Sequence, residues 1–491
     1  MQKDLNKKVT QATKWSTITE LTTRLVTPIT NAILARILVP EAFGVVATLM
    51  MVISFAEVFT DAGFQKYLVQ REFEDEDDLN LSTNVAFWTN IVFSLAVWGI
   101  IAVFVAPIAK LVGSEGHELA IIVISAEIPL MAFSSIQMAR YRRDFNFKNL
   151  FTVRVIVAMV PLVITVPLAL IFKNYWALVA GTLAKDVLNA VILTVRSRWK
   201  PTFRYSFSKL KNMISYSMWT IVENVTIWFS INAGTFIVSL AFGTYYLGLF
   251  KTTVSTINGY FSVLQSAVMP VLFATLARCQ SDDREFKTVF FKFQRMMAML
   301  VLPLGFGIFA FRELVTLILL GSQWLDTVDF VGMSALSLAF LFVFSYFNSE
   351  AFRGKGKPKL SVLAQAAYLI LMVPLLYACS KYSYTMLTVG NAFSNLLLAA
   401  ATTTVAHFVL RIRIGEVLKN IWPSLLSAAI MGLAGIGLRM LWDNMLWEVV
   451  SVFVCVLIYA GCMLLIPAGR RQLAEVPVLR KILRLKSGPE V

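Results

Sequence analysis

Ionisable side chains recur inside stretches of this sequence that are otherwise apolar and about twenty residues long, the length that spans a membrane as a helix. They are Glu20, Arg24, Glu57, Glu127, Lys185, Asp186, Glu223, Lys251 and Arg295, with Arg36, Asp61 and Arg154 nearer the ends of such stretches. A charge at membrane depth costs about 2.5–3.5 kcal/mol on insertion scales and usually faces a protein interior or an aqueous cavity. The sequence therefore predicts a polar cavity within the membrane.

These charged groups divide into two predicted roles. The basic candidates, which could bind an anionic substrate group at low dielectric, are Arg24, Lys185, Lys251 and Arg295. The acidic candidates, which could couple to H⁺ or Na⁺ or neutralise a nearby cation, are Glu20, Glu57, Asp186 and Glu223. Glu20 and Arg24 are four residues apart and share a helix face, so a self-neutralising pair is the alternative to substrate contact.

Residues for catalysis or metal binding form no recognisable pattern. The four cysteines lie far apart or inside apolar runs, and the two histidines are His117 and His407. Neither a CxxC nor an HExxH pattern occurs, so no metal ligand set is predicted. We predict no catalytic residue, and no cofactor apart from a coupling ion.

The composition predicts an all-α polytopic membrane protein. Hydrophobic residues make up 58% of the 491 positions and charged residues 15%, with a mean hydropathy of +0.71; soluble domains carry about 25% charged residues. Fourteen segments are long enough to span a membrane. They lie near residues 12–38, 43–64, 81–112, 118–140, 149–172, 175–195, 212–241, 246–274, 286–312, 327–350, 360–380, 384–410, 419–442 and 445–467.

The charges of the loops predict the orientation. With the N-terminus inside, 33 of the 44 Lys and Arg residues fall in inside segments and six outside. Under the positive-inside rule both termini are then cytoplasmic, in a multi-pass protein of the cytoplasmic membrane. The net charge of +15 follows from these loops and does not indicate nucleic acid. The acidic run at residues 72–78 reads as a solvated loop, with a docking site as the alternative.

An internal repeat predicts two lobes. Ile33–Gly44 and Ile237–Gly248 align without gaps at an offset of 204, keeping an Ile, a small residue and the final Gly. Six helices separate them, so both lobes enter the membrane in the same direction, with a pseudo-twofold axis along the membrane normal and a cavity between them. The predicted parts are a cytoplasmic N-terminus (1–11), lobes at 12–196 and 212–410, a linker (197–211), two extra helices (411–467) and a basic tail (468–491).

Short motifs spread over residues 10–410 resemble a known family. They are Leu34–Gly44, Asp61-Ala-Gly-Phe64, Asp144-Phe-Asn-Phe-Lys148, Trp176-Ala-Leu-Val179, Trp199-Lys-Pro201, Tyr246-Leu-Gly248, Met269-Pro270, Gly321-Ser-Gln-Trp324 and Gly354. In order and spacing the chain resembles the Wzx-type polysaccharide flippases of the MATE/oligosaccharidyl-lipid/polysaccharide exporter superfamily, most closely the colanic acid and teichuronic acid exporters.

The resemblance implies a flippase for undecaprenyl-diphosphate-linked oligosaccharides, driven by an ion gradient, with a glycan polymerase and assembly proteins as partners. It also implies that a basic residue of the first helix meets the diphosphate, and Arg24 is the matching candidate. Similar proteins often carry an Asp and a basic residue late in the seventh helix, where this chain has Asn232-Ala-Gly-Thr235. This departure puts ion coupling through those positions in doubt.

Three rival functions remain at this point. A small-molecule cation antiporter of the MATE type favours a carboxylate-dominated cavity. A membrane-bound glycan polymerase or ligase usually needs a large outer loop, and the predicted outer loops are short. A structural scaffold subunit leaves the intramembrane charges unexplained.

The predicted topology can be tested with reporter fusions. A fusion after Lys173 should report the outside and one after Lys211 the inside, because one predicted span separates them. The same side for both fusions would contradict the predicted helix order.

Overall fold

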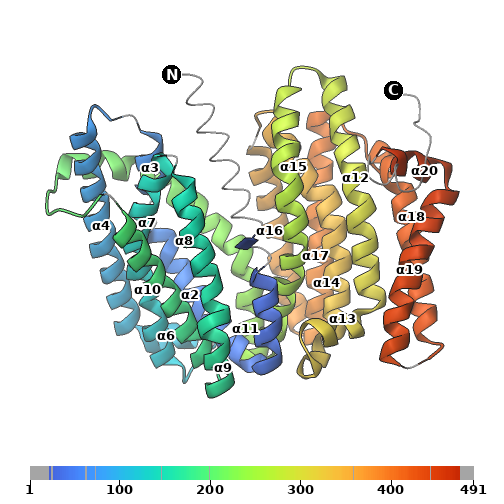
Figure 1. The fold of residues 1–491 in the computed structure, drawn as a ribbon, viewed down its shortest axis with the longest axis horizontal. Coiled ribbons are helices and arrows are strands. Elements are labelled where there is room, and N and C mark those ends of the chain that lie inside the picture. Colours follow the sequence, from blue (N-terminus) through green and yellow to red (C-terminus); the bar gives the residue numbers. More distant parts are fainter. Residues whose placement is uncertain are drawn as a thin grey trace. The chain divides into compact units, whose positions relative to one another are not determined.

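The computed structural model describes residues 22–23, 26–60, 64–71, 73–144, 146–197, 199–357, 359–442 and 444–475 (Figure 1). These residues form helices joined by short turns, and none of them lies in a strand. The all-α prediction is confirmed. The candidates Glu20 and Arg24, and the predicted N-terminal segment 1–11, lie outside the described residues.

Residue contacts group the chain into two compact units, residues 1–252 and 253–491. The division falls inside one helix, and the predicted lobe boundaries stay a prediction. The helices of the first unit are residues 26–37, α2 (Pro40–Thr60), α3 (Phe64–Gln70), α4 (Glu76–Val103), α5 (Val105–Leu111), α6 (Glu118–Ser125), α7 (Glu127–Arg143), α8 (Phe147–Val160), the π-helical turn η1 (Pro161–Thr165), α9 (Val166–Phe172), α10 (Trp176–Arg196) and most of α11 (Phe207–Arg278).

The second unit begins within α11. Its further helices are α12 (Asp283–Ala310), α13 (Arg312–Leu319), the 3₁₀ turn η2 (Ser322–Thr327), α14 (Val328–Leu341), the π-helical turn η3 (Phe342–Tyr346), α15 (Phe347–Gly354), α16 (Lys359–Ser380), α17 (Tyr384–Leu410), α18 (Ile414–Arg439), α19 (Met445–Leu465) and α20 (Pro467–Ala474). Within this unit α12 packs on both α14 and α18, and α16 packs on α17.

Twelve helices in the described residues are long and apolar enough to cross a membrane. One of them, residues 231–266, overlaps two predicted spans, and the first predicted span, 12–38, is described only in part. The chain is thus a multi-pass membrane protein, and the count of fourteen stays a prediction.

Polar caps define where several helices begin. Asp75 has extended backbone angles, and its side chain accepts a hydrogen bond from the Asp78 N–H at the start of α4. Asp282 and Ser383 cap α12 and α17 in the same way. Each cap satisfies a backbone donor that the first helical turn leaves unpaired.

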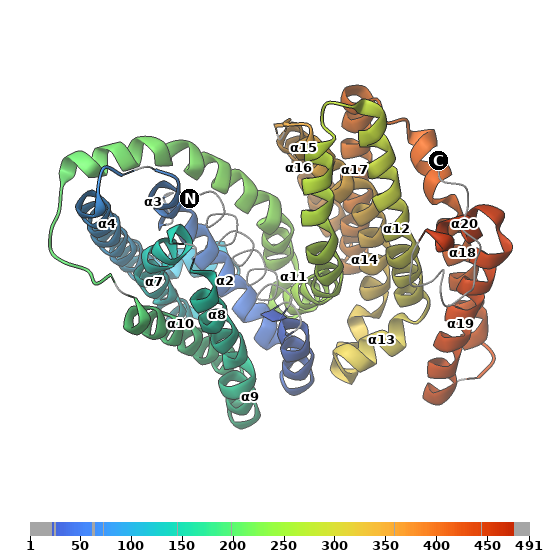
Figure 2. The same cartoon turned by 45° about the horizontal axis from the view of Figure 1, so that its top comes forward.

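The long helix α11 is interrupted at Gly243. This residue has φ 78° and ψ −173°, a conformation that is essentially restricted to glycine. Figure 2 shows α11 as a long bent ribbon rather than a straight rod. The break separates two rods, which correspond to the predicted spans 212–241 and 246–274.

The two repeat motifs meet each other at their glycines. A Cβ built on Gly44 would lie 1.8 Å from the Thr244 carbonyl oxygen, and one built on Gly248 would lie 1.9 Å from the Pro40 carbonyl oxygen. Both contacts lie within the first unit. Pro40 and Thr244, like Gly44 and Gly248, are separated by the repeat offset of 204. This reciprocity is what a local twofold axis between the motifs produces, and it supports the repeat that the sequence predicts.

Substituting Gly44 with alanine should destabilise the protein, because the new Cβ would overlap backbone atoms that cannot rotate away. Overpacking of this kind costs about 1–3 kcal/mol. Thermal unfolding in detergent should show a lower midpoint for Gly44→Ala. Gly99→Ala is the matched control, since a Cβ on Gly99 in α4 meets nothing within 4 Å. Equal midpoints for the two variants would contradict the close helix crossing.

Candidate functional site

A cavity of about 620 Å³ opens within the first unit. It is bounded by helices α2, α4, α7, α10 and α11, with Gln65 contributed by α3. Its lining mixes methionines and other apolar side chains with carboxylates, amides, hydroxyls and one lysine. A polar cavity surrounded by membrane-spanning helices is what the intramembrane charges predict.

Neutral polar side chains form one part of the lining and connect the helices. Asn90 of α4 donates from Nδ2 to Ser135 Oγ of α7 (3.1 Å), and Asn189 of α10 donates to Ser134 Oγ (3.2 Å). Trp228 of α11 donates from Nε1 to Ser54 Oγ of α2 (2.9 Å). Such interhelical hydrogen bonds substitute for the water that these groups lack in a membrane.

A cluster of two carboxylates and one lysine forms the charged part. Lys185 Nζ lies 3.9 Å from Glu127 Oε1 and 3.5 Å from Asp186 Oδ1. Glu127 and Asp186 line the cavity and are each only 5% exposed. Within the described part of the chain, Glu127 Oε2 and Asp186 Oδ2 are buried without a hydrogen-bond donor. One lysine thus contacts two carboxylates. When all three groups are ionised, the cluster has one negative charge in excess.

Lys251 is the lysine in the lining of this cavity. It lies eight residues after Gly243, which places it about 12 Å along the second rod of α11. The described residues provide no ion-pair or hydrogen-bond partner for its ammonium group. A cation in a membrane cavity that has no ion-pair partner among the described residues is a suitable contact for an anionic group of a ligand.

The structure brings four of the predicted site residues together at one cavity and pairs a fifth with a carboxylate of the second unit. Glu57, Asp186 and Lys251 line the cavity, and Lys185 contacts Asp186. Arg295 instead lies in the second unit, where Nη1 pairs with Glu475 Oε1 at 2.7 Å.

Three further candidates are described incompletely or not at all. Glu223 falls on α11, but its side chain is outside the described part, as are Glu20 and Arg24 entirely. The roles predicted for these residues stay predictions.

Several lining residues carry no predicted role from the sequence. Glu127 stands out in the sequence as a membrane charge, but its lysine partner comes from another helix and could not be inferred. Asn90 and Asn189 are amides inside apolar stretches, a signal that could have indicated the cavity. Asn232 also lines the cavity.

The fold and the cavity define a multi-pass helical membrane protein with a polar cavity, and solved structures agree in fold. The lipid II flippase MurJ in its inward closed conformation superposes with a TM-score of 0.72 at 12% identity, covering 92% of this chain and 98% of that one. An inward-facing multidrug resistance MATE family transporter of the MOP superfamily gives 0.62 at 14% identity, covering 82% and 99%. The resemblance to the flippase superfamily is thereby confirmed for the fold.

Sequence comparison gives the family. Residues 33–329 match the model of the polysaccharide biosynthesis protein family, and the chain belongs to that family. The succinoglycan biosynthesis transport protein ExoT of Rhizobium meliloti is 27% identical over 68% of this chain and 67% of its own length. The teichuronic acid biosynthesis protein TuaB of Bacillus subtilis is 19% identical over 89% of this chain and 90% of its own.

Proposed function

We propose that this protein is a flippase that moves an undecaprenyl-diphosphate-linked oligosaccharide across the cytoplasmic membrane. The family, a relative named as a succinoglycan transport protein and the fold shared with a lipid II flippase support this function. The sugar-bearing head group would occupy the cavity while the prenyl chain stays in lipid. Translocation requires no covalent step, and the proposal is therefore a transporter and not an enzyme.

The proposal rests on the position of Lys251 in the lining of the cavity. A diphosphate is a dense negative charge, and a lysine without an ion-pair partner among the described residues can neutralise part of it inside the membrane. The neutral amides and hydroxyls nearby are suitable partners for sugar hydroxyl groups, with Asn189 and Ser134 as examples. Arg24 remains a second proposed contact for the diphosphate.

The carboxylate–lysine cluster is the proposed coupling site. Two buried carboxylates that share Lys185 carry one excess negative charge, and a proton or Na⁺ would neutralise it. Binding and release of that ion in each cycle would couple head-group movement to an ion gradient. Asp186 was predicted for this role from the sequence, and Glu127 joins it because both contact the same ammonium group.

A cation antiporter is the second candidate function, and one observation favours it. Among the described residues, Glu57, Glu127 and Asp186 give the lining three carboxylates against one lysine, which is the carboxylate-rich lining expected for that class. The family favours the flippase, whereas the lining of the cavity favours an antiporter. Transport of an organic cation by purified protein would decide for the antiporter.

The charges of the loops indicate the membrane and the orientation of the proposed flippase. Both termini would be cytoplasmic in the inner membrane, with a glycan polymerase and assembly proteins acting on the delivered substrate.

Replacing Lys251 with methionine should slow flipping of the substrate by about ten-fold or more, the effect of losing one charge-assisted contact. Flipping can be measured in proteoliposomes with a fluorescent undecaprenyl-diphosphate disaccharide and a membrane-impermeant quencher. Lys251→Arg should retain part of the rate because the positive charge remains. Lys381→Met, which removes a lysine in the turn between α16 and α17, is the control. An unchanged rate in Lys251→Met would refute the role of Lys251.

Asp186→Asn should uncouple flipping from the driving ion while leaving substrate movement at zero gradient. The same proteoliposomes, given a pH gradient in one series and a Na⁺ gradient in another, would show which ion accelerates the unaltered protein. Loss of that acceleration in Asp186→Asn, with the zero-gradient rate kept, is the expected result. A variant that responds fully to the gradient would exclude Asp186 as the coupling residue, and Asp283→Asn on α12 serves as a control for charge removal.

A further inference from the structure

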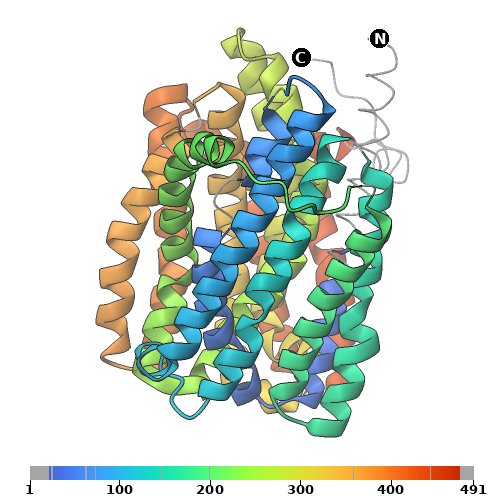
Figure 3. The same cartoon turned by 90° about the vertical axis from the view of Figure 1, so that its left-hand side faces the viewer.

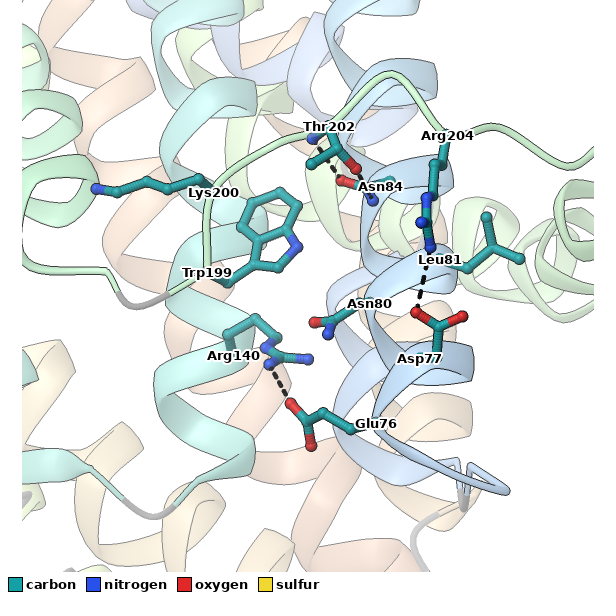
Figure 4. A pocket seen from close by; sticks show the side chains of 10 residues that line it. All are labelled: Glu76, Asp77, Asn80, Leu81, Asn84, Arg140, Trp199, Lys200, Thr202 and Arg204. Carbon is teal, nitrogen blue, oxygen red and sulfur yellow. Dashed lines mark hydrogen bonds and ion pairs between the residues drawn. The ribbon is translucent and has the colours of Figure 1, made fainter.

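The segment that joins α10 to α11 is bound to α4 through specific side chains. We call residues 200–205 the strap; Trp199, which precedes it, is buried and packs on Phe87 of α4. Figure 3 shows the segment crossing the front of the first unit, and Figure 4 shows its side chains next to those of α4. The strap lies over a pocket of about 410 Å³ that is also lined by Arg140 of α7 and by Asn80 and Asn84 of α4.

Thr202 forms the centre of this contact. Asn84 Nδ2 donates to Thr202 Oγ1 (2.7 Å), and the Thr202 N–H donates to Asn84 Oδ1 (2.9 Å). One helical turn further along α4, Trp88 Nε1 donates to the Thr202 carbonyl oxygen (2.8 Å). The backbone N–H, the backbone carbonyl and the hydroxyl of a single strap residue are thus all bound by α4, which defines one docked position.

Aromatic and charged contacts extend the docking on both sides of Thr202. Phe203 stacks on Trp88 with ring centroids 4.7 Å apart, and Thr89 of α4 hydrogen-bonds to the Tyr205 hydroxyl at 2.8 Å. Arg204 Nη1 lies 3.3 Å from Asp77 Oδ1, as the dashed line in Figure 4 marks.

The acidic run contributes three ion pairs at this end of the first unit. Its residues Glu76, Asp77 and Asp78 pair with Arg140, Arg204 and Lys209 respectively. Glu76 and Asp77 are largely exposed and Asp78 is not. The choice between a solvated loop and a docking site for the run stays a prediction.

The docked strap is specific but weakly held. The Phe203 side chain is 89% exposed, and the two members of the Arg204–Asp77 pair are 70% and 78% exposed. An exposed ion pair contributes about 0–1 kcal/mol and an average hydrogen bond about 0.5–1.5 kcal/mol. Segments with few buried apolar contacts and exposed hydrogen bonds open at low free-energy cost.

The strap connects two helices that carry the cavity. Asn84 lies six residues before the cavity residue Asn90 on α4, and the strap leads directly into α11, which carries Trp228 and Lys251. While the strap is docked, the start of α11 is tied to α4. We propose that the strap is a latch that leaves α4 and docks again in each transport cycle. This inference uses transport as a readout and therefore rests in part on the proposed function.

A reversible cross-link tests the latch. Thr89→Cys and Tyr205→Cys are combined in a background without Cys279, Cys379, Cys455 and Cys462, and a short thiol-specific, reducible cross-linker joins α4 to the strap. Flipping should stop on cross-linking and return on reduction, whereas the two single-cysteine variants should be unaffected by the reagent. A cross-linked protein that flips at the rate of the reduced protein would overturn the proposal.

A second measurement does not depend on transport. Trypsin cleavage after Arg204 in nanodiscs, identified by mass spectrometry, should be detectable in the unaltered protein and several-fold faster in Thr202→Val, which loses one bond to Asn84. Cleavage after Arg284 on α12 is the control and should not change. If the unaltered protein is never cut after Arg204 under conditions that cut Thr202→Val, the strap does not open and the proposal fails. A wild-type protein that is cut but does not flip substrate counts against the flippase function alone.

Discussion

The cost of an unpaired charge in a low-dielectric membrane is the constraint on which the rest of this structure depends. Lys185 pairs with two carboxylates. The neutral amides of α4 and α10 are likewise satisfied by hydrogen bonds to serines of α7. Lys251 has no ion-pair partner among the described residues. An anionic group of a ligand can pair with such a lysine. For this reason the cavity, rather than the surface, is the proposed site of transport.

In the first unit, close packing at glycines holds one helix crossing, and polar contacts hold the strap on α4. At Gly44 and Gly248 the helices approach so closely that the nearest atoms across the crossing are backbone atoms. At the end of α4 that begins with Glu76, ion pairs and hydrogen bonds hold the strap, and its side chains Phe203 and Arg204 stay largely exposed. Tight glycine packing favours a fixed crossing, whereas exposed polar contacts favour an interface that opens.

The sequence predicted the class of fold because spans and loop charges are properties of continuous segments. It also predicted that Glu57, Asp186 and Lys251 face a cavity, because a charge exposed to lipid is energetically costly. It could not predict that Lys185 pairs with Glu127, because that contact depends on how α7 and α10 pack. The repeat glycines were visible at their offset of 204, but their mutual contact was not. The placement of Arg295 beside Glu475 likewise depends on packing between distant segments.

Native mass spectrometry of the purified protein tests the central claim most directly, because it reports whether a lipid-linked diphosphate occupies the cavity. Protein incubated with undecaprenyl-diphosphate disaccharide should retain one lipid per chain. Lys251→Met should lose most of that lipid, and Lys381→Met should keep it. Equal retention by Lys251→Met and the unaltered protein would contradict the account, because the diphosphate would then bind without the cavity lysine.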